Sequence, residues 1–105
     1  MELTPKVETL YQRLLDELRK FGKFVVEEKK TSFHLKNRVA FAGVHPRRNY
    51  FILNIVSSTP INSPRIVRQE QVSSNRFHNE LKIENQEDMD NELMVWLKVA
   101  YELTA

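Results

Sequence analysis

The amino-acid sequence predicts an α+β domain in which a helix, an antiparallel sheet of about five strands and a second helix follow one another. Two apolar stripes at helical spacing lie near the two ends of the chain, and short stretches rich in β-branched and aromatic residues lie between them. This order predicts that both helices pack on one face of the sheet. A length of 105 residues fits a single domain, residues 1–105, with one hydrophobic core.

The first helix is predicted over about residues 5 to 21. Thr4 followed by Pro5 is a start signal, because a hydroxyl caps free backbone N–H groups and proline fits the first helical position. Gly22 marks the end of the helix. Its apolar stripe consists of Val7, Leu10, Tyr11, Leu14, Leu15, Leu18 and Phe21.

Four strands are predicted between Gly22 and Ser57. They cover residues 24–27, 32–36, 39–44 and 50–56. In the third strand, simple alternation places Phe41 on the opposite face from Ala40 and Ala42. The fourth strand is apolar on both faces, as is typical of a central strand.

Residues 57–76 are predicted to be irregular, because they hold two prolines, five serines and only scattered aliphatic residues. A fifth strand follows, with Phe77, Leu81 and Ile83 on one side. Asn85 is expected to cap the second helix. The buried stripe of that helix is predicted to consist of Met89, Leu93, Trp96, Leu97, Ala100 and Leu103.

The second face of the sheet is expected to be apolar and free of helices. The residues expected there are Ala40, Ala42, Tyr50, Ile52 and Val56. Such a surface needs a cover. We expect the loop 57–76 to fold across it, or a second copy or another protein to bury it.

Several kinds of chemistry lack support in the sequence. There is no cysteine, the three histidines show no metal-ligand spacing, and two glycines do not make a phosphate-binding loop. We therefore predict no catalytic residue, no metal and no cofactor. There is also no N-terminal export signal and no run of about eighteen apolar residues, so we expect a cytoplasmic protein without a membrane span.

The charge is distributed unevenly along the chain. The net charge is only +2, but the segment from Lys29 to Lys82 holds ten basic residues against two acidic ones. Alternate turns of an antiparallel meander emerge at the same end of a sheet, so the turns near residues 28–31 and 45–49 are expected to be neighbours. They carry Lys29, Lys30, His45, Arg47 and Arg48.

A phosphate backbone is the partner that such a basic surface fits, through an electrostatic attraction that is largely independent of sequence. Arg65 and Arg68 extend the candidate surface, because the planar arginine fork suits phosphate oxygens. The alternative for these arginines is pairing with acidic residues of the helices. The candidate anion-binding or nucleic-acid-binding residues are Lys29, Lys30, Arg47, Arg48, Arg65 and Arg68.

Three functions follow from these observations. The first is a noncatalytic binding module that contacts an anionic partner such as nucleic acid through the basic turns. The second is a protein-interaction module that forms a homodimer through the open sheet face. The third is an enzyme acting on a small anionic substrate where the loop 57–76 meets the sheet, which a deep cleft with converging histidine and arginine side chains would favour.

Four sequence motifs add a family resemblance. They are Lys29-Lys30-Thr31-Ser32-Phe33, Arg38-Val39-Ala40-Phe41-Ala42-Gly43-Val44-His45-Pro46, Ser63-Pro64-Arg65-Ile66 and residues 91–101, Asn91-Glu92-Leu93-Met94-Val95-Trp96-Leu97-Lys98-Val99-Ala100-Tyr101. Through these motifs, most of the chain resembles the bacterial domain-of-unknown-function family 5655. Domains of that family are often the C-terminal module of proteins labelled "predicted transport proteins". This resemblance supplies no catalytic residues that could be carried over to this chain.

The order of helices and strands is also similar to the frataxin-like arrangement, which iron-binding proteins share with small bacterial proteins proposed to bind DNA. Topology alone does not fix a function. Iron binding of that kind would use a continuous acidic ridge on the first helix, and basic residues interrupt the acidic ones there.

Overall fold

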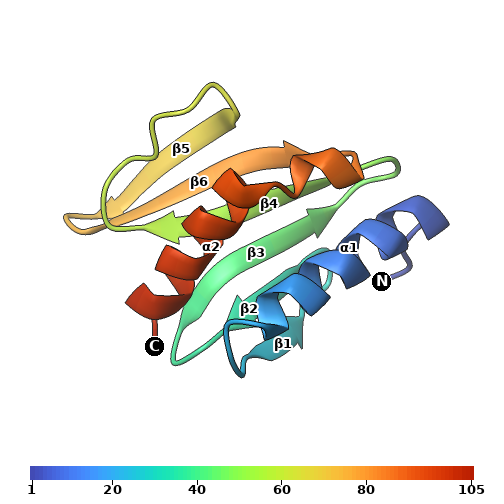
Figure 1. The fold of residues 1–105 in the computed structure, drawn as a ribbon, viewed down its shortest axis with the longest axis horizontal. Helices are drawn as coiled ribbons and strands as arrows, with labels where there is room; N and C mark the ends of the chain where they lie inside the picture. The colour runs from blue at the N-terminus through green and yellow to red at the C-terminus, as the bar shows by residue number, and fades with distance from the viewer.

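A computed structural model describes all residues, 1–105, as two helices packed on a six-stranded antiparallel sheet (Figure 1). The strand order is β1-β2-β3-β4-β6-β5. The helices are α1 (Pro5–Arg19) and α2 (Asn91–Leu103), and a short 3-10 helix, η1 (Gln86–Asp88), precedes α2. The strands are β1 (Val25–Glu28), β2 (Phe33–Lys36), β3 (Ala40–Pro46), β4 (Phe51–Ser57), β5 (Ile66–Ser73) and β6 (Arg76–Ile83).

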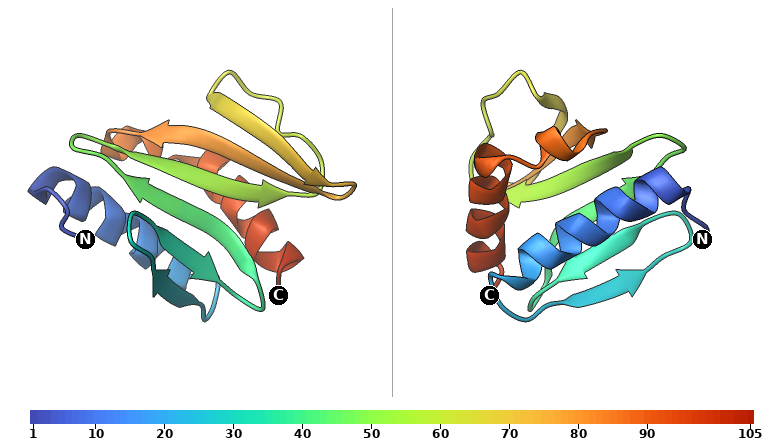
Figure 2. Two further views of the ribbon diagram at one scale, coloured as in Figure 1. Left: turned by 180° about the vertical axis from the view of Figure 1, so that it is seen from behind. Right: turned by 45° about the vertical axis from the view of Figure 1, so that its right-hand side comes forward.

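The molecule has two layers. Both helices lie on one face of the sheet, and the view from behind shows the other face without a covering element (Figure 2). The predicted fold class is therefore confirmed, with six strands in place of about five. Between the layers, 20 residues form one hydrophobic core; they come from α1, α2 and the covered face of the sheet, together with Met89 just before α2.

Helix α1 buries the predicted stripe from Val7 to Leu18. The Thr4 side chain accepts a hydrogen bond from the backbone N–H of Val7, which caps the helix start. The helix ends at Arg19, two residues before the predicted end, and Gly22 then takes a positive φ of 147°. Phe21 lies beyond the helix but still packs against the core.

A β-bulge in β3 changes which residues face the core. Leu35 pairs with Ala42 and Lys36 pairs with Ala40, so Phe41 is an extra residue on β3. Phe41 and Ala42 are both buried in the core, and Phe41 meets the rings of Phe24 and Tyr101 edge-on. The expectation that Ala42 lies on the open face is therefore wrong.

The expectation of an irregular segment over residues 57–76 is also wrong for its second half. Ile66–Ser73 forms β5, which pairs with β6 at the edge of the sheet. The remaining loop does not cross the open face, because Arg65 at its end contacts the start of α2 on the helix side. The buried Asn79 side chain fixes this region by accepting hydrogen bonds from the Ile61 N–H and the Gln69 side chain.

The second helix begins later than predicted. Asn85 precedes the 3-10 turn η1, in which the Asp88 carboxylate accepts hydrogen bonds from the N–H groups of Glu84 and Asn85. Helix α2 starts at Asn91, and Asp90 caps it by accepting a hydrogen bond from the Leu93 N–H. Neither helix is long and apolar enough to cross a membrane.

Candidate functional site

A hollow of about 420 Å³ lies where the β1–β2 turn, the β3–β4 turn and the segment before α1 meet. It is the place in the fold where basic side chains from separate turns come together. The residues that line it are Met1, Glu2, Thr4, Lys30, Thr31, Pro46, Arg47 and Arg48.

Hydrogen bonds hold the backbone of both turns. The Lys29 N–H donates to the Ser32 carbonyl at 2.7 Å, and the Arg47 N–H donates to the Tyr50 carbonyl at 2.8 Å. The Thr4 hydroxyl donates to the Arg48 carbonyl at 2.8 Å and so joins the start of α1 to the β3–β4 turn. The sequence indicated Thr4 as a helix cap, but this second bond depends on tertiary structure and has no sequence signal.

Three cations around the hollow lack an acidic partner. Lys30, Arg47 and Arg48 are exposed, and they take part in none of the ion pairs of the structure. The Arg47 guanidinium donates only to the carbonyl of Pro46, at 3.2 Å. The N-terminus of α1 adds the positive end of its helix dipole beside them. Glu2 is the one acidic residue that lines the hollow.

Lys29 lies in the same turn but is neutralised. Its Nζ lies 2.6 Å from Oε1 of Glu27, and Glu27 also pairs with Lys36 at 3.5 Å. The hydrogen bond from Lys29, together with the nearby charges of Lys29 and Lys36, lowers the pKa of Glu27. Lys29 therefore contributes less free positive charge than Lys30.

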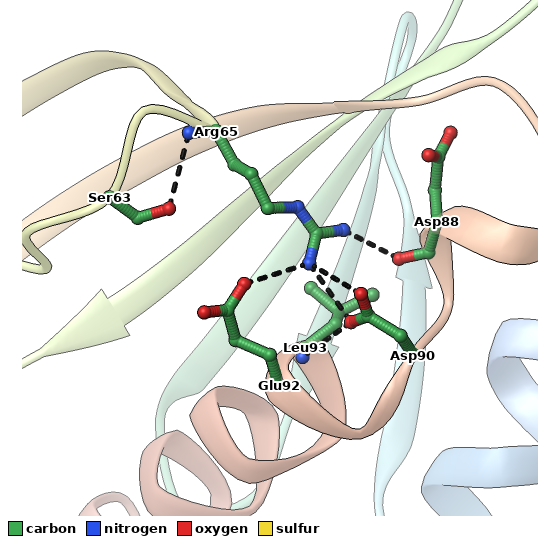
Figure 3. A network of polar contacts seen from close by, with 6 residues as sticks. All are labelled: Ser63, Arg65, Asp88, Asp90, Glu92 and Leu93. Atoms are coloured by element: carbon green, nitrogen blue, oxygen red, sulfur yellow. Dashed lines mark hydrogen bonds and ion pairs between the residues drawn. The ribbon is translucent and has the colours of Figure 1, made fainter.

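Arg65 belongs to another part of the molecule. Its guanidinium donates to both carboxylate oxygens of Asp90, at 2.9 and 3.1 Å, and to Glu92 at 3.1 Å (Figure 3). It also donates to the Asp88 carbonyl at 2.6 Å and lies over the Trp96 ring. This is the internal pairing that the sequence offered as the alternative for Arg65.

These contacts change the pKa values of both partners. Burial opposes the charge of Arg65, but the hydrogen bonds to Asp90 and Glu92 outweigh it and raise the pKa of Arg65. The Leu93 N–H, followed by Arg65, lowers the pKa of Asp90. Arg65 thus connects the end of the loop to the start of α2 through hydrogen bonds and ion pairs.

Arg68 also lies away from the hollow. It is on β5, where it pairs with Glu70 at 3.6 Å and with Glu80 at 4.0 Å. Of the six candidate residues, the structure brings Lys29, Lys30, Arg47 and Arg48 to the two turns. It does not bring Arg65 and Arg68 to them.

The open sheet face carries both polar and apolar residues, since Ile52 and Val56 lie on it opposite His45 and His78. One row across it, in register, consists of Glu27, His34, Gly43, Asn54, Glu80 and Arg68. His45 and His78 lie on the same face, and burial lowers the pKa of each of them. No group of three or more histidine, aspartate or glutamate side chains is arranged to hold a metal ion.

Two other hollows are relevant to the enzyme alternative. The one between the loop 57–65 and α2 measures about 320 Å³, and neither histidine nor arginine lines it. A hollow of about 750 Å³ lies at the other end of β1, between Gly22, Phe24 and Asn37. Its charged lining residues are Arg19, Lys23 and Lys36. Neither hollow combines histidine with arginine.

Comparison with known proteins identifies a family. The family model described as "Domain of unknown function (DUF5655)" matches residues 3–104, so the chain belongs to that family. This confirms the family predicted from the motifs. Neither the curated proteins nor the solved structures gave a significant match. The similarity to frataxin-like proteins therefore stays a prediction.

Proposed function

We propose that this DUF5655 domain is a noncatalytic binding module that contacts an anionic partner, nucleic acid in the first place, through Lys30, Arg47 and Arg48. One observation carries the proposal: three exposed cations from two separate turns line one hollow without an acidic partner of their own. Seven of the other thirteen basic side chains, Arg65 and Arg68 among them, are already in ion pairs with acidic residues.

The chemistry of the three residues suits phosphate groups. Arg47 and Arg48 each present a planar fork that donates two parallel hydrogen bonds to one phosphate, and Lys30 adds a point charge from the neighbouring turn. The backbone bond from Thr4 to Arg48 fixes the turn before a ligand arrives. Such contacts give affinity without reading a base sequence.

The same charges set the strength of binding. With about three phosphates neutralised, the logarithm of the binding constant falls with the logarithm of the salt concentration with a slope of about −2 to −3. The whole chain has a net charge of only +2, so the field away from the hollow is weak. We expect binding in the micromolar range or weaker at low salt, in the cytoplasm, to a flexible or single-stranded segment that fits between the two turns.

The two alternatives have less support. Dimerisation through the open sheet face needed a continuous apolar surface, and on that face a row of polar and charged residues separates Ile52 from Val56. An enzyme at the loop 57–76 needed a cleft with converging histidine and arginine side chains. The hollow between this loop and α2 contains neither, and the hollow of about 270 Å³ between the loop and β5 is lined by Arg68 but by no histidine.

The test is fluorescence anisotropy with labelled DNA and RNA oligonucleotides at salt concentrations from about 20 to 300 mM. We compare the wild type with Arg47→Glu/Arg48→Glu. A matched control, Lys23→Glu/Arg38→Glu, makes the same charge change at two exposed cations away from the two turns.

The proposal expects a steep salt dependence and a loss of at least about tenfold in affinity for the double arginine variant, with a much smaller loss for the control. Absence of binding at the lowest salt would refute nucleic acid as the partner. An equal loss in both variants would mean that net charge, and not this hollow, drives the interaction.

A further inference from the structure

Helix α2 is apolar on two opposite sides. One side, with Leu93, Leu97 and Ala100, is buried in the core. On the other side Val95, Val99 and Leu103 repeat every four residues and are 60%, 53% and 46% exposed. A helix on the surface of a monomer normally presents polar residues there. These three residues form an apolar ridge, which we call the α2 ridge.

The α2 ridge continues onto its neighbours. Trp96, only partly buried, lies on one flank, and the hollow of about 320 Å³ separates Trp96 and Val99 from Pro60 and Ile61 of the loop. The apolar side chains share this hollow with the polar residues Ser57, Ser58, Thr59 and Asn62.

Two charges border the other flank of the α2 ridge. Lys98 and Glu102 are one helical turn apart, both are exposed, and neither forms an ion pair. In the helical projection they lie on the same side of Val99, opposite Trp96. A partner with the same two charges in reverse order along its axis would neutralise both.

A second copy of this chain is such a partner. We infer that two copies associate through the α2 ridge, with the helices antiparallel and a two-fold axis at Val99. In that arrangement Val99 meets Val99 of the second copy, and Val95 meets Leu103. With a rise of about 1.5 Å per residue, Lys98 lies about 3 Å along the helix axis from Glu102 of the other copy, and the symmetry makes this pair twice.

A second copy makes use of both the apolar ridge and the two charges. An apolar ridge alone would accept many helices, but the paired charges are self-complementary only when the second helix has the same sequence and runs the opposite way. The proposed nucleic-acid surface at the β1–β2 and β3–β4 turns is separate from α2, so the dimer does not depend on that function.

Sedimentation equilibrium from about 0.01 to 1 mM tests the inference, because this range covers weak dimers. We expect the wild type to dimerise and Val99→Asp to weaken the dimer at least tenfold, since two aspartates would then face each other. Val25→Asp is the matched control, because Val25 is 64% exposed and lies on β1. It should dimerise like the wild type.

Charge reversal tests the antiparallel arrangement. Lys98→Glu and Glu102→Lys should each weaken self-association, because each puts like charges together at the two contacts. An equimolar mixture of the two variants should form a heterodimer at least as strong as the wild-type dimer. Both residues are exposed, so the variants should fold, which circular dichroism checks.

Two results would overturn the inference. A wild type that stays monomeric up to 1 mM would mean that a different protein, or nothing, covers the α2 ridge. A dimer that Val99→Asp leaves unchanged, or a mixture of charge variants that stays monomeric, would show that the copies do not meet in this way.

Discussion

The hydroxyl of Thr4 donates a hydrogen bond to the backbone carbonyl of Arg48, 44 residues further along the chain. The same oxygen accepts a hydrogen bond from the Val7 N–H and caps α1. One side chain therefore fixes both the start of the helix and the turn that carries the two unpaired arginines. The cap stabilises the helix, and the bond to Arg48 connects that stability to the candidate binding surface.

Replacing Thr4 with alanine should lower the free energy of unfolding by about 1 to 2 kcal/mol, because the cap and the bond to Arg48 are both lost. Thr4→Ser keeps the hydroxyl and should cost less than half as much. Urea unfolding followed by circular dichroism measures the difference. Equal stability of Thr4→Ala and wild type would show that water replaces both bonds without cost.

Replacing Arg65 with methionine should separate the end of the loop from α2. The variant loses the contacts with Asp90, Glu92 and the Asp88 carbonyl, and we expect a loss of about 1 to 3 kcal/mol. Arg65→Lys should recover only part of this, since an ammonium group lacks the planar fork. Thermal unfolding measures both variants. Neither should change nucleic-acid binding, because Arg65 lies away from the two turns.

The sequence predicted the parts of the fold that depend on local pattern. The stripe from Val7 to Leu18 and the apolar strand β4 each repeat with the period of their element, and both formed as predicted. Strand β5 did not show such a pattern. It lies at the edge of the sheet with most of its residues exposed, so no apolar alternation distinguishes it from a loop.

The bulge at Phe41 was not predicted for a similar reason. Alternation counts residues along one strand, but an extra residue is defined only by the pairing with the next strand, here β2. One inserted residue moved Ala42 from the expected open face into the core. The bulge moved only Ala42 away from the open face, because Ile52 and Val56 lie there as predicted, opposite His45 and His78.

The position of the candidate site could be predicted from the sequence, but which of its cations are unpaired could be predicted only in part. Turn geometry indicated that residues 28–31 and 45–49 are neighbours, and side chains from both turns line one hollow. Which cations are free depends on their acidic neighbours in space. Lys29 pairs with Glu27 two residues away, whereas Arg65 reaches Asp90 across the fold. The second of these pairs has no signature in sequence spacing.

Asn79 is expected to be the most sensitive polar residue in the sheet. It is fully buried, donates to the Ile55 carbonyl and the Ser57 hydroxyl, and accepts from Gln69 and the Ile61 N–H. Asn79→Ala removes all four bonds and leaves the Ile61 N–H without its acceptor, while Ser57 and Gln69 keep their bonds to the Thr59 and Ile61 carbonyls. The variant should cost about 2 to 4 kcal/mol.

Asn54 provides the control for this prediction. It lies on the neighbouring strand β4 and faces the open side, and its Oδ1 has no hydrogen-bond partner. Asn54→Ala should therefore change the free energy of unfolding by less than about 1 kcal/mol. Similar losses for the two alanine variants in urea unfolding would contradict the role assigned to the Asn79 network.

Tyr11 should make the fold sensitive to alkaline pH. Its ring stacks on Phe33 with centroids 4.5 Å apart, and its hydroxyl is buried without a hydrogen-bond partner. Burial, followed by the charge of Glu8, raises the pKa of Tyr11 from 10.0 to about 12. The unfolded chain therefore releases this proton at a lower pH than the folded one. The stability that the protonated hydroxyl contributes is complete below pH 10 and is lost as the pH rises toward 12.

Tyr11→Phe keeps the stacked ring and removes the titration. We expect the variant to be as stable as the wild type at pH 8 and more stable at pH 11, as measured by urea unfolding at both values. The two proteins share every other ionisable group, so the quantity that decides is the difference between their stabilities. A difference that does not grow from pH 8 to pH 11 would show that the Tyr11 hydroxyl reaches water in the folded protein.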